Sequence, residues 1–141
     1  MSLVYFAEAK ARRSSESLLE KLSRIVRGSE LPNIISAGDK VLIKCHMGAE
    51  LTTRYLRPVY VRRIVEEVKA LGGEPLIVET TGLSLLDPRG TAGNYLKVAI
   101  SHGYTPEALG APIIIADGER GLDAFKVKVN GLKTRVASLA G

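Results

Sequence analysis

The segment that most constrains the fold is residues 40–73, because it contains a complete strand, loop and helix. Residues 40–46 form a short, nearly continuous apolar run, which is typical of a strand covered on both faces in a parallel sheet. Pro58 suits the first turn of a helix, and apolar residues then recur at three- and four-residue steps. Gly72 and Gly73 end the helix. This segment predicts an α/β fold.

The rest of the chain repeats this alternation of strands and helices. Ser14 is a good N-cap for a helix that ends at Gly28, and a later helix begins near Thr91 or Asn94. Alternating residues around Asn130–Gly131 predict a β-hairpin. Further strands are expected at residues 3–9, 75–79 and 111–117. We therefore expect a Rossmann-like, three-layer, open and mostly parallel sheet with a C-terminal β-hairpin.

Length and composition indicate a single α/β domain over residues 1–141. Residues 137–141 look like the first turn of a helix, so we expect the N-terminal part of a longer protein. No secretion signal is recognisable, and no apolar run is long enough for a membrane span, which favours a cytoplasmic location and excludes a membrane partner. One cysteine excludes an internal disulfide.

The formal net charge of +5 raises the question of nucleic-acid binding. The basic residues are scattered and interspersed with acidic ones, and no helix-turn-helix, zinc-finger or RNA-recognition pattern occurs. A solvated basic surface explains this composition better than a nucleic-acid partner. A homo-oligomer that forms through the edge of the hairpin remains an alternative at this point.

Two long loops are candidates for a binding site, at residues 46–57 and 80–93. Both follow strands, and in open α/β sheets ligands bind beyond the carboxyl ends of the strands. Hydroxyl groups, arginines and free helix N–H groups favour a small anion. Alternatively, the arginines are solvated or paired with carboxylates. The candidate ligand-binding residues are Thr53, Arg54, Arg57, Thr80, Thr81 and Asp117, with Arg89 near the same crevice. A strand-end carboxylate, Glu79 or Asp117, that faces His46 would make an acid–base pair.

His46 is the candidate catalytic residue, because it ends a strand at the polar loop and histidine exchanges protons near neutral pH. The alternative is a histidine that only hydrogen-bonds to the backbone. Cys45 points to the opposite face of the strand, so no metal site is predicted, and His102 suits a structural role at a helix end. No common nucleotide-binding or hydrolase motif occurs.

Four segments in order carry a family resemblance: KCHMG, TRYLRPVYVRRIVEEVKALGGEP, ETTGL and GAPIIIADG. With them the chain resembles the amino-terminal portion of the uncharacterised iron–sulfur-centre proteins, domain-of-unknown-function family 362. The resemblance implies a prokaryotic, redox-linked protein whose clusters are held by a cysteine-rich segment further along, which is absent here. No cofactor is therefore expected in this chain. The matching positions are His46, Gly48, Thr53, Arg57, Pro58, Thr80, Asp117 and Gly118.

Three functions remain open at this point. The first is an anion-binding domain of a larger redox-linked protein, with Arg54 or Arg57 as the clamp. The second is a small acid–base enzyme that uses His46, which resembles the amino-terminal domain of nickel-pincer racemases only in its expected fold. The third is a structural or interaction module that pairs through its hairpin edge.

Overall fold

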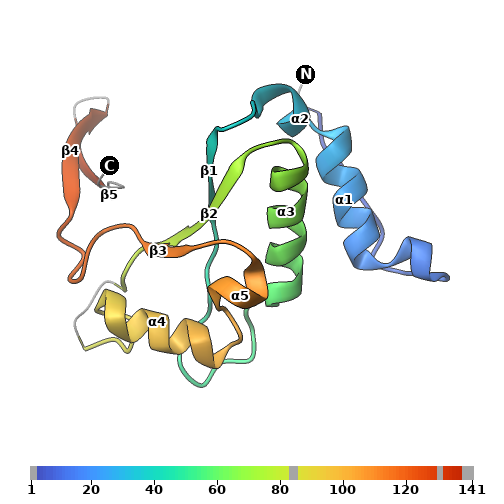
Figure 1. The fold of residues 1–141 in the computed structure, drawn as a ribbon. Coiled ribbons are helices and arrows are strands. Elements are labelled where there is room, and N and C mark those ends of the chain that lie inside the picture. The colour runs from blue at the N-terminus through green and yellow to red at the C-terminus, as the bar shows by residue number, and fades with distance from the viewer. Residues whose placement is uncertain (1–2, 83–85, 130–131, 138–141) are drawn as a thin grey trace.

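The computed structural model describes residues 3–82, 86–129 and 132–137 (Figure 1). A short 3-10 helix, Ser14–Glu16, precedes α1 (Leu18–Gly28) and α2 (Leu31–Ile34). The central part of the chain alternates strands and helices: β1 (Lys40–Lys44), α3 (Pro58–Ala70), β2 (Glu74–Glu79), α4 (Ala92–Ser101), α5 (Pro106–Leu109) and β3 (Ile113–Ile115). Two further strands follow, β4 (Ala124–Val129) and β5 (Leu132–Ala137).

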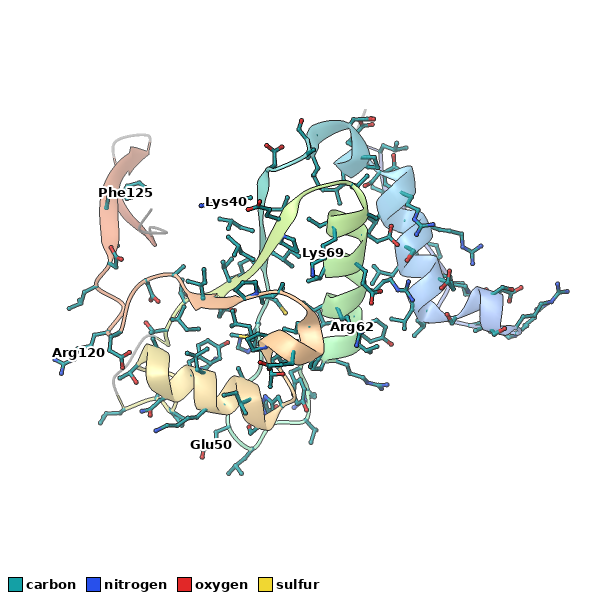
Figure 2. The ribbon with its side chains drawn as sticks, in the orientation of Figure 1. Lys40, Glu50, Arg62, Lys69, Arg120 and Phe125 are labelled. Carbon is teal, nitrogen blue, oxygen red and sulfur yellow. The ribbon has the colours of Figure 1, made fainter. Side chains whose placement is uncertain are left out.

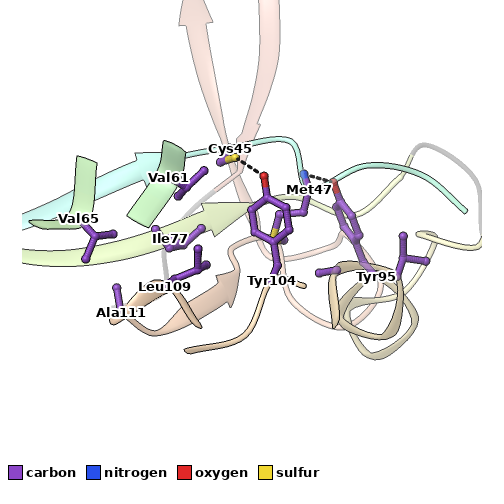
Figure 3. Close-up of a cluster of buried hydrophobic side chains, with 11 residues drawn as sticks. Cys45, Met47, Val61, Val65, Ile77, Tyr95, Tyr104, Leu109 and Ala111 are labelled. Atoms are coloured by element: carbon purple, nitrogen blue, oxygen red, sulfur yellow. Dashed lines mark hydrogen bonds between the residues drawn. The ribbon is translucent and has the colours of Figure 1, made fainter. Parts of the chain in front are cut away.

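The central sheet is parallel, with the strand order β1-β2-β3. Ile43, Ile77 and Ile113 lie opposite one another in its register. Ile77 is fully buried, and it packs in one cluster with Val61 and Val65 of α3 (Figure 3). The apolar stripe predicted for residues 58–71 therefore covers one face of the sheet, and the α/β fold class is confirmed.

The opposite face of the sheet is not covered by helices in the same way. Leu42 lies opposite Leu76, and Val78 lies opposite Ile114, so alternation puts these four side chains on one face. Leu42 is 45% exposed and Ile114 is 37% exposed. In Figure 1, α4 lies below the ends of the strands instead of over this face. The three layers expected from the sequence are thus not found in the described residues.

Residues 3–9 were expected to form the first strand, but in this structure they do not pair with the sheet. They form neither helix nor strand. Leu3, Val4 and Phe6 are 74%, 83% and 87% exposed, and the Lys21 ammonium binds the carbonyl oxygen of Glu8 at 2.7 Å. Apolar, β-branched and aromatic residues favour a strand only when a neighbouring strand and a covering layer are in place.

The other boundaries differ from the expected ones by a few residues. Ser17, not Ser14, caps α1, and its side chain accepts the Glu20 N–H. The strand expected at residues 111–117 is limited to Ile113–Ile115. β4 and β5 pair antiparallel, whereas the turn predicted at residues 130–131 lies outside the described residues. Among the helices that the structure describes, none has the length and apolar character needed to cross a membrane.

The charged side chains are distributed over separate elements. Figure 2 shows Lys40 on β1, Arg62 and Lys69 on α3, and Arg120 in the loop after β3. Arg62 binds Glu66 at 3.0 Å on the exposed face of α3. The labelled basic side chains therefore come from separate elements, and the solvated basic surface stays a prediction.

Candidate functional site

A polar pocket of about 270 Å³ lies at the carboxyl end of the sheet. Three segments contribute to it. The first is His46, directly after β1, and the second is the end of β2 with the start of its loop, Glu79 to Gly82. The third contributes Arg89 from the loop before α4 and Tyr95 from α4 itself. Since parallel strands end at the same edge of a sheet, this is where a ligand site of an α/β protein is expected.

His46 is held by a tyrosine and lies near a buried carboxylate. Its Nδ1 is 3.0 Å from the Tyr95 hydroxyl oxygen and 3.7 Å from a Glu79 carboxylate oxygen. The Met47 N–H donates to the same tyrosine oxygen at 3.4 Å (Figure 3), so the hydroxyl proton is free to point at Nδ1. In that arrangement Nε2 carries the imidazole proton. The side chain is 52% exposed, so it is accessible to a ligand.

Glu79 is a buried carboxylate with a compensating cation. It is 5% exposed, and the Lys44 ammonium lies 2.8 Å from its oxygens. The Thr80 N–H donates to it at 2.9 Å. Burial of the Tyr95 ring, together with the charge of Glu79, raises the pKa of the Tyr95 hydroxyl to about 12. Tyr95 therefore remains a neutral hydrogen-bonding group at physiological pH.

Asp117 organises the loop after β2 and is not part of the pocket lining. It is 6% exposed, and its two oxygens accept the Thr81 N–H at 2.9 and 3.0 Å. The Thr81 hydroxyl also donates to it at 2.6 Å. A Cβ at Gly121 would lie 2.6 Å from the Thr81 hydroxyl oxygen, so the segment after β3 can pass this close only with glycine. Asp117 thus fixes Thr81 at the pocket wall.

Arg89 reaches the pocket over the ring of Tyr95, 5.9 Å from its centroid. Its Nε and Nη2 bind the two oxygens of Asp87 at 3.0 and 2.8 Å. The side-chain hydrogen bonds from Arg89 lower the pKa of the Asp87 carboxyl to about 2. The aspartate fixes the position of the guanidinium and partly neutralises it.

Three of the residues expected at the site lie elsewhere. Thr53, Arg54 and Arg57 are exposed and do not line this pocket. The Arg54 backbone N–H donates to the Thr52 hydroxyl, and Arg57 is the N-cap residue of α3 without a side-chain cap. This turn of the loop after β1 therefore lies outside the pocket lining.

Contacts from α4 and the segment after it determine that turn. His102 Nδ1 lies 2.9 Å from the Met47 carbonyl oxygen, and its ring stacks on Tyr55 with centroids 4.0 Å apart. The buried Tyr104 donates its hydroxyl hydrogen to the Leu56 carbonyl. His102, the C-cap residue of α4, therefore has a structural role: it binds the Met47 carbonyl and so holds the loop after β1 against α4.

Gly48 is a position of this loop at which the structure accommodates only glycine. Its φ is +99°, and a Cβ there would lie 2.5 Å from His102 Nδ1. A side chain would be strained in the backbone and would displace the histidine ring. The glycine in the KCHMG segment is thus explained by the packing of the loop on α4.

Tyr95 is the pocket residue that sequence reasoning missed. It lies on the apolar side of α4 and is 1% exposed, so its spacing indicates a core residue. Its hydroxyl, however, is directed at His46. Glu79 was expected at a strand end, where a carboxylate could face His46, and Arg89 near the same crevice; the available signal was their position next to strand ends and glycines.

The residues present do not fit an iron–sulfur cluster. Such clusters are held by several cysteine thiolates, and this sequence has only Cys45. Its thiol is buried 3.5 Å from the Tyr104 hydroxyl, and burial raises its pKa. Within the described residues, no group of three or more histidine, cysteine or acidic side chains could hold a metal ion.

Comparison with known proteins identifies the family. A family model described as "Domain of unknown function (DUF362)" matches residues 41–140, which extend from β1 to beyond β5 and include every residue of the pocket. No curated protein and no solved structure matches the chain. Because the family model covers well over half of the sequence, the chain belongs to the DUF362 family.

Proposed function

We propose that the pocket beside His46 binds a small molecule with an anionic group, such as a carboxylate or phosphate. The observation that supports it is the convergence of three separate chain segments on one polar pocket at the carboxyl edge of the sheet. In the expected arrangement Arg54 or Arg57 held the anion. The proposal assigns that contact to Arg89 and His46 instead, since these two are the basic side chains among the described residues that line the pocket.

The hydrogen-bond inventory of the pocket supports a ligand that accepts hydrogen bonds. The carboxylates of Glu79 and Asp87 have cationic partners, and Asp117 accepts three hydrogen bonds from Thr81. His46 Nε2 is not engaged by another side chain in the described residues. An incoming oxygen atom would therefore meet a donor at His46 and a fixed guanidinium at Arg89.

A binding assay with simple probes tests this proposal. Inorganic phosphate and pyruvate are titrated at constant ionic strength, with chloride as the control, and amide and histidine ring signals are followed by NMR. We expect saturable shifts at His46 and at Thr80 to Gly82. His46→Gln and Arg89→Gln should weaken binding by about tenfold or more, whereas Arg54→Gln should leave it unchanged.

Two results would overturn the proposal. One is the absence of saturable shifts with either probe. The other is a set of shifts centred on Arg54 and Arg57, which would return the anion to the loop that the sequence favoured. Urea denaturation of each variant separates loss of the pocket from loss of the fold.

A second function, acid–base catalysis by His46, is favoured by one specific distance. Glu79 lies 3.7 Å from Nδ1, close enough to stabilise a protonated imidazole after a small ring movement. With Nδ1 as the donor to the Tyr95 oxygen or to Glu79, Nε2 is free to take a proton from a bound ligand. Exchange of the methyl protons of pyruvate in D₂O, followed by proton NMR, should then occur and be lost in His46→Gln.

The wider setting of this domain follows from the family resemblance. It favours a cytoplasmic, prokaryotic, redox-linked protein in which any cluster is held by cysteines outside this chain. A Rossmann-like relationship also belongs to this expectation. The proposed anion binding at the pocket depends neither on this redox-linked setting nor on a Rossmann-like relationship.

A further inference from the structure

The outer edge of β1 is unpaired in the described sheet. β1 is the first strand in the order β1-β2-β3 and pairs only with β2. The Asp39 carbonyl accepts the Glu74 N–H, and the Cys45 N–H donates to the Val78 carbonyl. Since backbone groups of alternate residues face opposite sides of a strand, the N–H groups of Leu42 and Lys44 point to the free edge.

An apolar groove of about 480 Å³ lies beside this edge. Its walls are α1, α3 and the last residues of β1, and its lining is mostly apolar. Ala7 and Glu8 of the N-terminal segment already form part of that lining, together with Ile43 and Cys45. The groove therefore lies between the unpaired edge and residues 3–9.

Residues 3–9 have the properties of the missing edge strand. Exposure alternates over residues 4–8: Val4 and Phe6 are 83% and 87% exposed and Glu8 is exposed, whereas Tyr5 is 39% exposed and Ala7 is partly buried. Tyr5 comes within 3.9 Å of the position where a Gly28 Cβ would lie at the end of α1. An extended segment with one side facing a helix shows this period of two.

The topology allows one position for such a strand. α1 packs beside α3, and α3 joins β1 to β2 over the same face of the sheet (Figure 1). Parallel crossovers are right-handed, so a strand joined to β1 through α1 must lie on the side of β1 away from β2. That side is the free edge beside the groove.

We propose that residues 3–9 dock on the outer edge of β1 as a fourth, parallel strand of the sheet. In this position Tyr5 and Ala7 remain under α1, and Val4 and Phe6 lie beside Leu42 on the open face. Lys21, whose ammonium binds the carbonyls of Glu8 and Lys10, anchors the segment at the mouth of the groove. Docking removes an exposed strand edge, which is otherwise a template for pairing with another chain.

Amide hydrogen exchange of β1 in the full chain tests the proposal. We expect the Leu42 and Lys44 amides to exchange at least about tenfold more slowly in the wild type than in Tyr5→Pro/Phe6→Pro. Adjacent residues direct their N–H groups to opposite edges, so one of the two prolines always removes a donor that faces β1. The exposed Leu122→Ser serves as the control variant and should leave both rates unchanged.

Each alternative outcome has a distinct meaning. Rapid exchange of the Leu42 and Lys44 amides in the wild type overturns the proposal. Protection that disappears on dilution, with a dimer seen by light scattering, also overturns it in favour of strand exchange between two copies. The Ile43 and Cys45 amides, which face β2, report whether the double variant is folded. If it is not, a Phe6–Leu42 nuclear Overhauser effect in the wild type decides alone.

Discussion

Replacement of Gly48 by alanine provides a quantitative test of how the loop after β1 is held. The residue has a φ of +99°, and a new Cβ would lie 2.5 Å from His102 Nδ1, 2.7 Å from its Cε1 and 3.2 Å from the Tyr55 Cβ. An L-residue in left-handed backbone costs about 1–2 kcal/mol. Displacing the His102 ring also leaves the Met47 carbonyl without its donor, which costs about 1–3 kcal/mol. We expect a total loss of about 2–5 kcal/mol.

The chain offers a matched control at Gly38. Its φ is +86°, and a Cβ there would meet nothing within 4 Å. Gly38→Ala therefore carries the backbone cost alone, and the difference between the two variants measures the contact with His102. The assay is urea denaturation at pH 7, in which the midpoint shifts at an unchanged m-value.

Equal losses in the two variants, within about 0.5 kcal/mol, would refute this reasoning. In that case the His102 ring would not lie against the loop as described. His102→Ala provides a second check: in that background Gly48→Ala should cost only the backbone part, about 1–2 kcal/mol, because the ring that a Cβ would displace is already absent.

Three further perturbations test other parts of the structure. Tyr104→Phe should cost about 0.5–1.5 kcal/mol in urea, because the Leu56 carbonyl loses its hydroxyl partner. It should also lower the reactivity of Cys45 toward thiol reagents, because burial raises the pKa of that thiol and the hydrogen bond from Tyr104 that lowers it is lost. Glu67→Gln should lower the urea midpoint at pH 7 but not at acid pH. The hydrogen bond from Arg27 lowers the pKa of Glu67. The ion pair therefore stabilises the fold above the ordinary glutamate pKa of about 4.3, and this stabilisation is lost as the pH falls through the lowered native pKa. Tyr95→Phe should lessen the fall in stability between pH 10 and 12 by about 1.4 kcal/mol per pH unit, because the unfolded tyrosine ionises from its ordinary pKa of about 10 whereas native Tyr95, with a pKa raised to about 12, keeps its proton. A wild-type stability that is flat between pH 10 and 12 would contradict the last expectation.

The elements of the fold that the sequence predicted best are those specified by local signals. The apolar spacing of residues 58–71, Pro58 at the start and Gly72 after the end were sufficient for α3, because a helix face and its caps depend on residues within a few positions. The same holds for β2, where a short apolar run lies between turn residues. In the candidate site, His46 and the Thr80–Thr81 pair could be placed because they follow strands that share one edge.

The composition of the pocket was decided by tertiary structure. Arg54 and Arg57 have the charge that an anion requires, but the Met47 contact with His102 and the Leu56 contact with Tyr104 direct their loop away. These contacts join residues 55 and 48 positions apart, and no local pattern encodes them. The apolar spacing of α4 correctly predicted that the ring of Tyr95 is buried. It gave no information about the direction of the hydroxyl group. The sequence alone thus determined where strands, helices and their ends occur, since those depend on short-range sterics and periodicity. Only the folded chain determined which polar atoms meet, since that depends on long-range packing.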